Sequence, residues 1–248
     1  ISFVQNAKDM NNARKLLDGY KGKLIAKIEK FDAVANIDEI IEASDGIMVA
    51  RGDLGIEVPY YDVPTIQKML IKKANLKGIP VITATQMLLS MTQNERATRA
   101  EISDVANAVL DGTDVVMLSE ESAVGEDPIN VVDTMHNIIA KTEGIYNYDK
   151  QYEMPYLDEF DVIQATVTKL ADDLKANGIL AITSSGKSAL KMSRYRPRTP
   201  IFTFTHKKKV LNSLTAIWGV EPIGIIKEAQ ASKMFQKMLK SLDEIGKL

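Results

Sequence analysis

The sequence contains no cysteine, which excludes disulfide bonds, thiolate nucleophiles and cysteine metal ligands. The two histidines, His136 and His206, offer no ligand pair for a metal. Trp218 and the tyrosines form no array of the kind that stacks on single-stranded nucleic acid. No apolar run approaches the length of about eighteen residues that a membrane-spanning helix needs.

The chain also lacks an excess of charge of either sign, with a formal net charge of −2. Such a balance gives no general attraction to nucleic acid or to anionic membranes, so we expect neither as a partner. The local cluster Lys207–Lys209 is typical of a solvated turn. The absence of cysteine fits a reducing compartment, and we expect a cytoplasmic location.

An initiator methionine is missing as well. The chain opens at Ile1–Gln5, which resembles the tail of a strand already in progress. We therefore expect the 248 residues to be part of a longer protein. With 45% hydrophobic and 26% charged residues, the chain has enough apolar material for a large core or for two domains.

Four short apolar runs recur in the first part of the chain, and a polar cluster follows each of them. The runs are Leu24–Ile28, Ile47–Ala50, Val81–Ala84 and Val115–Leu118. Amphipathic stretches lie between them, at Asn36–Ala43, Val63–Leu76 and Glu101–Leu110. Strands that alternate with helices predict parallel βαβ units, in which the carboxyl ends of the strands carry the active site.

The second of these strands runs into Arg51, Gly52 and Asp53. We expect a sharp turn there, because Gly52 and Gly55 allow tight turns and close approach to a ligand. Asp53 would then project a carboxylate from the end of a rigid strand, as metal ligands do. An isolated Arg-Gly-Asp tripeptide is nevertheless more often a plain surface loop than a site.

Two carboxylates at the ends of adjacent strands, Glu29 and Asp53, suit Mg²⁺, which completes its shell with water and substrate oxygens. Lys27 would lie on the same face as Glu29, since side chains alternate along a strand. A cation, a metal and an anionic substrate together would stabilise phosphoryl transfer or an enolate. The alternative is that Lys27 and Glu29 form a structural salt bridge.

The pattern breaks at Tyr146–Asp161, which we interpret as a domain boundary between residues 1–148 and 149–248. A smaller α/β domain is predicted beyond it, with elements at Val162–Ala176, Ile179–Ile182, Pro200–Thr205 and Phe235–Ile245. The loop Thr183–Ser188 could hold a phosphate through hydroxyls, Lys187 and free helix amides. It could equally be a plain Ser/Thr helix cap.

Taken together, these motifs resemble the pyruvate kinase family. The matching stretches, in family order, are Ile25–Glu29, Asp45–Gly55, Ala84–Met87, Thr98–Glu101, Ser103–Ala108, Met117–Ser119 with Glu121, and Arg194–Pro197. The resemblance covers nearly the whole chain. It implies the C-terminal half of a (β/α)8 TIM barrel, starting at the end of the fourth strand, followed by a smaller and truncated α/β domain for effector binding and assembly.

The resemblance also implies an activity, the transfer of phosphate from phosphoenolpyruvate to ADP to give pyruvate and ATP. Lys27 would stabilise the transferring phosphoryl group, and Glu29 and Asp53 would ligate Mg²⁺ or Mn²⁺. Backbone amides near Arg51, Gly52 and Asp53, with the Thr85 hydroxyl, would bind the substrate carboxylate. Ser119 and Glu121 would pass the proton that converts the enolate to pyruvate.

Regulation and assembly are implied as well. The effector loop would comprise Thr183, Ser184, Ser185, Gly186, Lys187 and Ser188, and would take a sugar phosphate. Arg99 and its helix would lie near a subunit contact of a homotetramer. K⁺ is expected in the full-length enzyme, although its ligands, the lid domain and the first half of the barrel are absent from the sequence.

Three positions depart from the family pattern: Ala33, Glu120 and Ser122. Glu120 is the one expected to crowd the site or to alter the charge near Glu121. Because so much of the family's length is missing, we expect little or no activity from the isolated chain. Two alternatives remain open, a Mg²⁺-dependent aldolase or lyase acting through a pyruvate enolate, and a non-catalytic fragment for effector binding and assembly.

Overall fold

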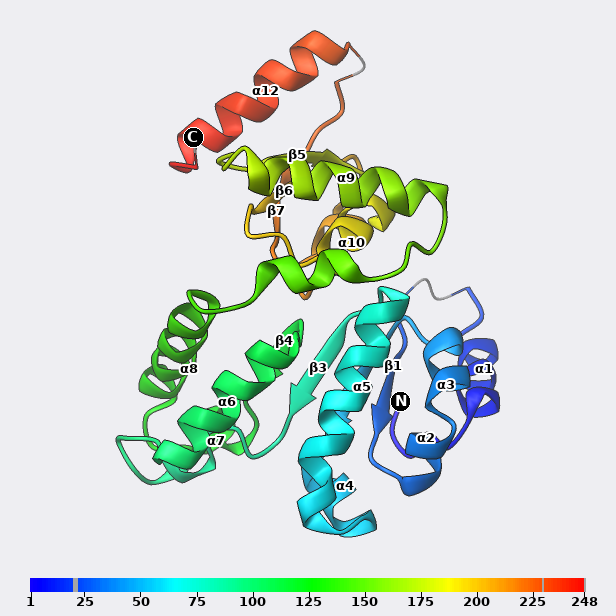
Figure 1. Cartoon of the computed structure of the whole chain (residues 1–248), viewed down its shortest axis with the longest axis vertical. Helices are drawn as coiled ribbons and strands as arrows, with labels where there is room; N and C mark the ends of the chain where they lie inside the picture. The colour runs from blue at the N-terminus through cyan, green and yellow to red at the C-terminus, as the bar shows by residue number, and fades with distance from the viewer. Residues whose placement is uncertain (20–21, 229, 248) are drawn as a thin grey trace. The chain divides into compact units, whose positions relative to one another are not determined.

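The computed structural model describes residues 1–19, 22–228 and 230–247, which form two compact units, Ile1–Asn147 and Tyr148–Leu248 (Figure 1). The first unit contains a parallel sheet with strand order β1-β2-β3-β4. Its strands are β1 (Ile25–Ile28), β2 (Gly46–Ala50), β3 (Val81–Ala84) and β4 (Val115–Met117). The predicted alternation of strands and helices, and with it the α/β class, is confirmed.

The register of this sheet fixes where the strands end. Ile28 pairs with Val49, Ala50 with Ala84, and Ala84 with Met117. The residues that follow each strand therefore emerge along one edge of the sheet, because parallel strands direct their carboxyl ends the same way. Ile1 extends the pairing beyond β1, since its carbonyl accepts a hydrogen bond from the Lys27 amide at 2.9 Å.

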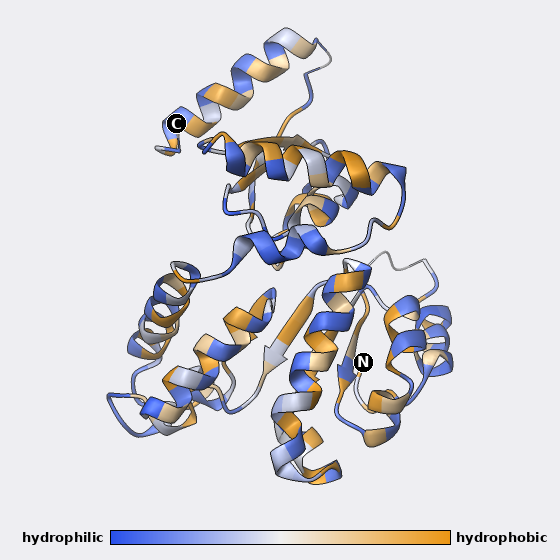
Figure 2. Ribbon diagram, in the orientation of Figure 1, coloured by the Kyte–Doolittle hydropathy of each residue, from blue (hydrophilic) through white to orange (hydrophobic). Residues whose placement is uncertain are grey.

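The helices of the first unit connect and flank these strands. They are α1 (Ala7–Leu16), α2 (Phe31–Ala35), α3 (Ile37–Ala43), α4 (Arg51–Glu57), α5 (Val63–Lys77), α6 (Arg99–Asp111), α7 (Glu120–Ala123) and α8 (Pro128–Glu143), with short 3-10 helices η1 (Tyr60–Asp62) and η2 (Leu89–Thr92). The long helices show both hydrophilic and hydrophobic colours along their length in Figure 2, as amphipathic helices do.

Local sequence signals set the ends of the two best-defined helices. Thr98 and Glu101 form the predicted capping box at the start of α6, which ends at Gly112 with φ of 92°. Helix α5 ends at Gly78 with φ of 71°, where the left-handed conformation is accessible to glycine without steric cost.

The expectation of a sharp turn after β2 is wrong. Arg51 is the first residue of α4, which follows the strand without an intervening loop. Neither Gly52 nor Gly55 has a positive φ. A Cβ at Gly52 would lie 3.4 Å from the Thr85 hydroxyl oxygen, which is an ordinary van der Waals contact, so neither φ nor close approach requires a glycine there.

Two apolar clusters form the core of the first unit. One joins strands β1 and β2 to the helices around them through Ile28, Ile40, Ile47, Leu70 and Ile71, all buried. The other packs η2, α6 and α8 together. Burial on this scale fixes the carboxyl edge of the sheet as a rigid platform, because core side chains are close-packed.

The second unit has its own parallel sheet, in the order β5-β6-β7. Its elements are η3 (Tyr148–Glu153), α9 (Glu159–Asp173), β5 (Ile179–Ile182), α10 (Lys187–Arg194), β6 (Ile201–Thr205), α11 (Lys208–Ser213), β7 (Val220–Ile225) and α12 (Ala231–Glu244). Arg194 and Asp161, both fully buried, join α10 to α9 through an ion pair of 2.9 Å. None of the described helices in either unit has the length and apolarity needed to cross a membrane.

Two predicted helices of this unit are displaced from their observed bounds. Helix α9 begins three residues before the predicted Val162, because the Asp158 side chain accepts a hydrogen bond from the Asp161 amide and caps it. It also ends three residues before the predicted Ala176. The last helix begins at Ala231, four residues before the predicted Phe235.

Candidate active site

The carboxyl edge of the first sheet brings Lys27, Glu29 and Asp53 together. Lys27 Nζ lies 2.6 Å from Glu29 Oε2 and 3.8 Å from Asp53 Oδ2. The Glu29 side chain is 2% exposed, whereas that of Asp53 is 60% exposed. One ammonium group therefore bridges a buried carboxylate, directly after β1, and an open carboxylate in the first turn of α4, which follows the neighbouring strand β2.

The charges of this cluster are coupled. Hydrogen bonding to Glu29 raises the pKa of Lys27. Burial acts to raise the pKa of Glu29, but hydrogen bonds from Lys27 and from the Phe3 amide outweigh it, and the pKa of Glu29 is lowered. The Phe3 amide lies 2.6 Å from Glu29 Oε1. Glu29 is thus held as a carboxylate at neutral pH.

The donor set of this cluster fits a hard divalent cation, because carboxylate oxygens are the protein ligands that Mg²⁺ prefers. Glu29 and Asp53 are two such ligands, and Mg²⁺ often takes one or two from the protein. No group of three or more histidine, aspartate or glutamate side chains in metal-binding proximity occurs among the described residues. Water and a bound substrate would have to complete the coordination shell.

Thr85 lies beside this cluster, directly after β3, in a left-handed conformation with φ of 72°. Its hydroxyl donates to the Ala84 carbonyl at 2.6 Å and accepts from the Gly52 amide at 2.8 Å. The amide that sequence analysis assigns to a substrate carboxylate is therefore engaged by Thr85 in this structure. The next residue, Gln86, is also left-handed, with φ of 54°.

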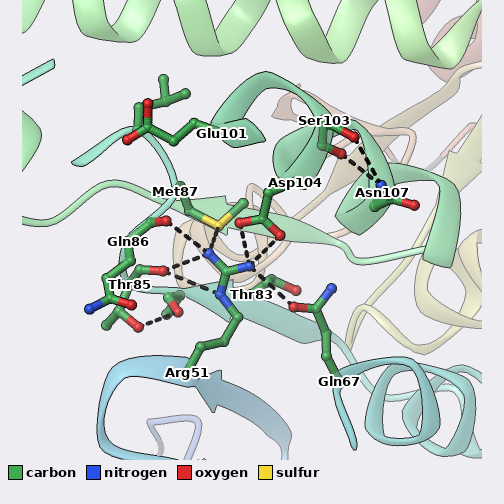
Figure 3. A network of polar contacts seen from close by, with 12 residues as sticks. Arg51, Gln67, Thr83, Thr85, Gln86, Met87, Glu101, Ser103, Asp104 and Asn107 are labelled. Atoms are coloured by element: carbon green, nitrogen blue, oxygen red, sulfur yellow. Dashed lines mark hydrogen bonds and ion pairs between the residues drawn. The ribbon is translucent and has the colours of Figure 1, made fainter. Parts of the chain in front are cut away.

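Arg51 is buried, with 9% of its side chain exposed, and its guanidinium points toward Asp104 and the chain at Thr85–Met87 (Figure 3). It donates to the carbonyls of Thr85 and Gln86 and forms an ion pair with Asp104. Any contact of Arg51 with a substrate is thus left to its backbone amide. Sequence reasoning did not predict the Asp104 contact, although Asp104 lies within the Ser103–Ala108 motif.

Ser119 and Glu121 follow β4, but they differ in accessibility. Glu121 is fully buried and accepts hydrogen bonds from the Leu88 amide at 3.1 Å and the Ser119 amide at 2.7 Å. Ser119 is half-buried. Glu120, expected to crowd the site, is exposed in the first turn of α7. The buried Glu121 carboxylate therefore fixes the backbone of Ser119 through the Ser119 amide.

The hydroxyl-rich loop of the second unit joins β5 to α10. Thr183 is buried, and its hydroxyl accepts from the Gly186 amide at 2.9 Å. Gly186 precedes α10 with φ of 88°, and no described side chain caps this helix. Ser184, Ser185 and Lys187 are exposed. The first amides of α10 are thus available beside exposed hydroxyls and a lysine.

Two family models match this chain and together cover most of it. One, described as "Pyruvate kinase, barrel domain", matches residues 1–132. The other, described as "Pyruvate kinase, alpha/beta domain", matches residues 161–248.

Individual relatives agree with these matches. A pyruvate kinase of Lactobacillus delbrueckii subsp. bulgaricus is 44% identical over 254 residues, which cover 99% of this chain and 43% of that protein. A pyruvate kinase of Clostridium acetobutylicum is 48% identical over 229 residues, covering 90% of this chain and 48% of that protein. The chain thus spans less than half the length of these two relatives.

A solved structure shows the same similarity in three dimensions. The crystal structure of a pyruvate kinase from Cryptosporidium parvum matches with a TM-score of 0.95 at 38% sequence identity. The match covers 100% of this chain and 54% of that one. Both described units therefore have counterparts in a solved relative.

Proposed function

Because this chain belongs to the pyruvate kinase family, we propose that it is part of an enzyme that transfers the phosphoryl group of phosphoenolpyruvate to ADP. The products are ATP and the enolate of pyruvate, which takes up a proton to give pyruvate. Residues 1–148 would be the C-terminal half of the barrel and residues 149–248 a truncated domain for effector binding and assembly. The observation that carries the proposal is the bridging of Glu29 and Asp53 by Lys27.

Each group of this cluster has a role that follows from its charge. The Lys27 ammonium, 30% exposed, faces the site and would neutralise the phosphoryl oxygens during transfer. Glu29 and Asp53 would hold Mg²⁺ or Mn²⁺, which supplies positive charge for the substrate carboxylate and phosphate. The same two carboxylates pair with Lys27 in this structure, so the Lys27 ammonium lies where it could turn to the phosphoryl group.

The remaining site residues would orient the substrate and move the proton. The amides of residues 51–53, with the Thr85 hydroxyl beside them, would contact the substrate carboxylate. Ser119 is the more accessible member of its pair, and its hydroxyl would deliver the proton to the enolate carbon. The Ser119 hydroxyl would regain a proton from solvent. Glu121, which accepts hydrogen bonds from the Ser119 and Leu88 amides, would set the position of Ser119 in this proton transfer.

The second unit would regulate the first through a phosphorylated ligand. The available amides of α10, the hydroxyls of Ser184 and Ser185, and Lys187 are groups that bind phosphate. A sugar phosphate is the ligand class that we propose for this loop. We further propose that the protein is a cytoplasmic homotetramer, with Arg99 exposed at the start of α6 near a subunit contact, and that it also uses K⁺.

The test is pyruvate formation from phosphoenolpyruvate and ADP with Mg²⁺, in the protein that carries this chain. Lys27→Met should lower kcat by on the order of a hundredfold or more, because it removes the charge from the transferring group. Lys30→Met is the matched control, since Lys30 forms a single ion pair of 2.6 Å with Glu57. Equal activity of both variants would refute the role of Lys27.

The same assay separates the two rival functions. A lyase or aldolase would consume phosphoenolpyruvate or a pyruvate enolate without ADP, whereas a kinase would form no pyruvate in its absence. A non-catalytic module would bind a sugar bisphosphate in calorimetry and show no turnover under any condition. Pyruvate formation that depends on both ADP and Mg²⁺ supports the kinase alone.

A further inference from the structure

Arg51 and Gly52 both donate hydrogen bonds to Thr85. The guanidinium donates to the Thr85 carbonyl from Nη2 at 2.7 Å and from Nε at 3.2 Å. The adjacent amide, that of Gly52, donates to the Thr85 hydroxyl at 2.8 Å. The start of α4 therefore fixes both the backbone and the side chain of this residue (Figure 3).

These hydrogen bonds stabilise an unfavourable backbone conformation at Thr85 and Gln86. Thr85 and Gln86 are consecutive left-handed residues, and neither is glycine. The left-handed region is disfavoured for residues with a Cβ, above all for β-branched ones, so it persists only where contacts enforce it. Here the guanidinium donates to both carbonyls, since its Nη2 also lies 3.2 Å from the Gln86 oxygen.

Asp104 in turn holds the guanidinium. Arg51 Nη1 donates to both carboxylate oxygens of Asp104, at 2.7 and 2.6 Å, and to the Gln67 side-chain oxygen at 3.3 Å. A buried guanidinium needs such a counter-charge, because an uncompensated charge is strongly disfavoured away from water. Asp104 itself is 37% exposed, on the side of α6 that borders a cavity of about 830 Å³.

We propose that Asp104 and Arg51 are positioning residues that hold the Thr85 hydroxyl in place for the substrate. Asp104 orients the guanidinium, the guanidinium enforces the left-handed Thr85 and Gln86, and this conformation directs the hydroxyl toward the Gly52 amide. The inference rests on the proposed function. It assigns to one carboxylate of α6 the positioning of a site residue that follows β3.

The experiment is a double-mutant cycle on steady-state kinetics in the protein that carries this chain. Asp104→Asn removes the charge with little change in shape, and Thr85→Val removes the hydroxyl. Asp104→Asn alone should lower kcat/KM for phosphoenolpyruvate on the order of tenfold to a hundredfold, through displacement of Thr85. The KM for ADP should change less than about twofold, because Thr85 faces the other substrate.

The cycle then asks whether Asp104 acts through Thr85. In the Thr85→Val background, Asp104→Asn should cost less than about threefold, because the hydroxyl that it positions is already gone. Asp104→Glu, which keeps the carboxylate, should recover most of the lost kcat/KM. Asp38→Asn is the matched control, since Asp38 also uses both oxygens for one cation, Lys73, at 2.6 Å on the surface.

The outcomes are distinct. Equal costs of Asp104→Asn in the two backgrounds would overturn the inference. So would a fall in kcat/KM that the fraction of unfolded protein, measured by circular dichroism on the same sample, accounts for in full. A wild-type protein without pyruvate formation would instead refute the proposed function. Should Asp104→Asn fail to fold, Arg51→Lys keeps the positive charge but removes the planar guanidinium that donates to the carbonyls of Thr85 and Gln86, and an unchanged kcat/KM would overturn the inference.

Discussion

The buried charges at the edge of the first sheet each have a partner of opposite sign. Glu29 is paired with Lys27 at 2.6 Å, and Arg51 with Asp104 at 2.6 Å. Burial of a lone charge is disfavoured by several kcal/mol, so removing one partner affects stability as well as chemistry. For a variant of either pair, both activity and the free energy of unfolding must therefore be measured.

The lowered pKa of Glu29 predicts how stability depends on pH. Glu29→Gln should lower the free energy of unfolding by about 1–3 kcal/mol at pH 7, through loss of charged hydrogen bonds. Because the folded pKa lies below the ordinary value of 4.5, the wild-type advantage is fully present above that value. It should disappear as the pH falls through the lowered folded pKa.

Urea unfolding followed by far-ultraviolet circular dichroism, at pH values from 7 down to about 3, measures this difference. Glu39→Gln serves as a control, because Glu39 is an exposed carboxylate outside the cluster. A difference between wild type and Glu29→Gln that stayed constant to the lowest pH would contradict the stabilising role of the Glu29 charge.

At the scale of elements, Gly178 allows β5 to pack against β6. An added Cβ at this position would lie 2.2 Å from Phe202 Cε2, a separation at which the aromatic ring must move. Gly178→Ala should therefore lower the free energy of unfolding of the second unit by about 1–3 kcal/mol. Gly224→Ala in β7 is the control, since no heavy atom lies within 4 Å of its added Cβ.

Trp218 makes this prediction simple to check. It is the single tryptophan of the chain and it lies in the second unit, so its fluorescence during urea unfolding reports that unit. Equal urea midpoints for Gly178→Ala and Gly224→Ala would contradict the prediction, because they would mean that Phe202 moves aside with no loss of unfolding free energy.

Elements with strong local signals were predictable from the sequence. The bounds of β3 agree with the prediction because the left-handed Gly78 ends α5 and Pro80 precedes the strand. Strand β7 was missed because Pro222 and Gly224 interrupt its apolar pattern. Helix α4 was missed for a similar reason, since two glycines in seven residues disfavour a helix unless tertiary contacts hold it.

The candidate site divides in the same way. The proximity of Lys27 and Glu29 follows from the alternation of side chains along one strand. Asp53 lies near them because it follows β2, the parallel neighbour of β1. The Arg51–Asp104 ion pair joins residues 53 apart in sequence. It depends on how closely α6 approaches α4, which packing determines and no local pattern encodes.

At the scale of the molecule, the chain spans 43% and 48% of the two relatives described above. Its first sheet ends at β4, which pairs only with β3 among the described strands. An unpaired strand edge and half-buried strand residues favour association with other strands.

We therefore expect the 248-residue chain, expressed alone, to form pyruvate at a rate at least on the order of a hundredfold below that of the protein that carries it, through incomplete positioning of the substrates. The mass of the purified sample should first be verified as 27.4 kDa, after which the steady-state assay with ADP and Mg²⁺ applies. Near-normal turnover by a sample of this mass would contradict the expectation.

The strand order of the first sheet, β1-β2-β3-β4, is also the order in which a ribosome makes the strands. Each strand therefore pairs with the one synthesised just before it, and no pairing has to wait for a distant segment. Each pairing still spans a whole helical connection, from Ile47 to Val81 for example, and closing such a connection is the slow step in forming a parallel sheet. The sheet can grow one strand at a time while the chain is still being translated, with each new strand covering the exposed edge of the last.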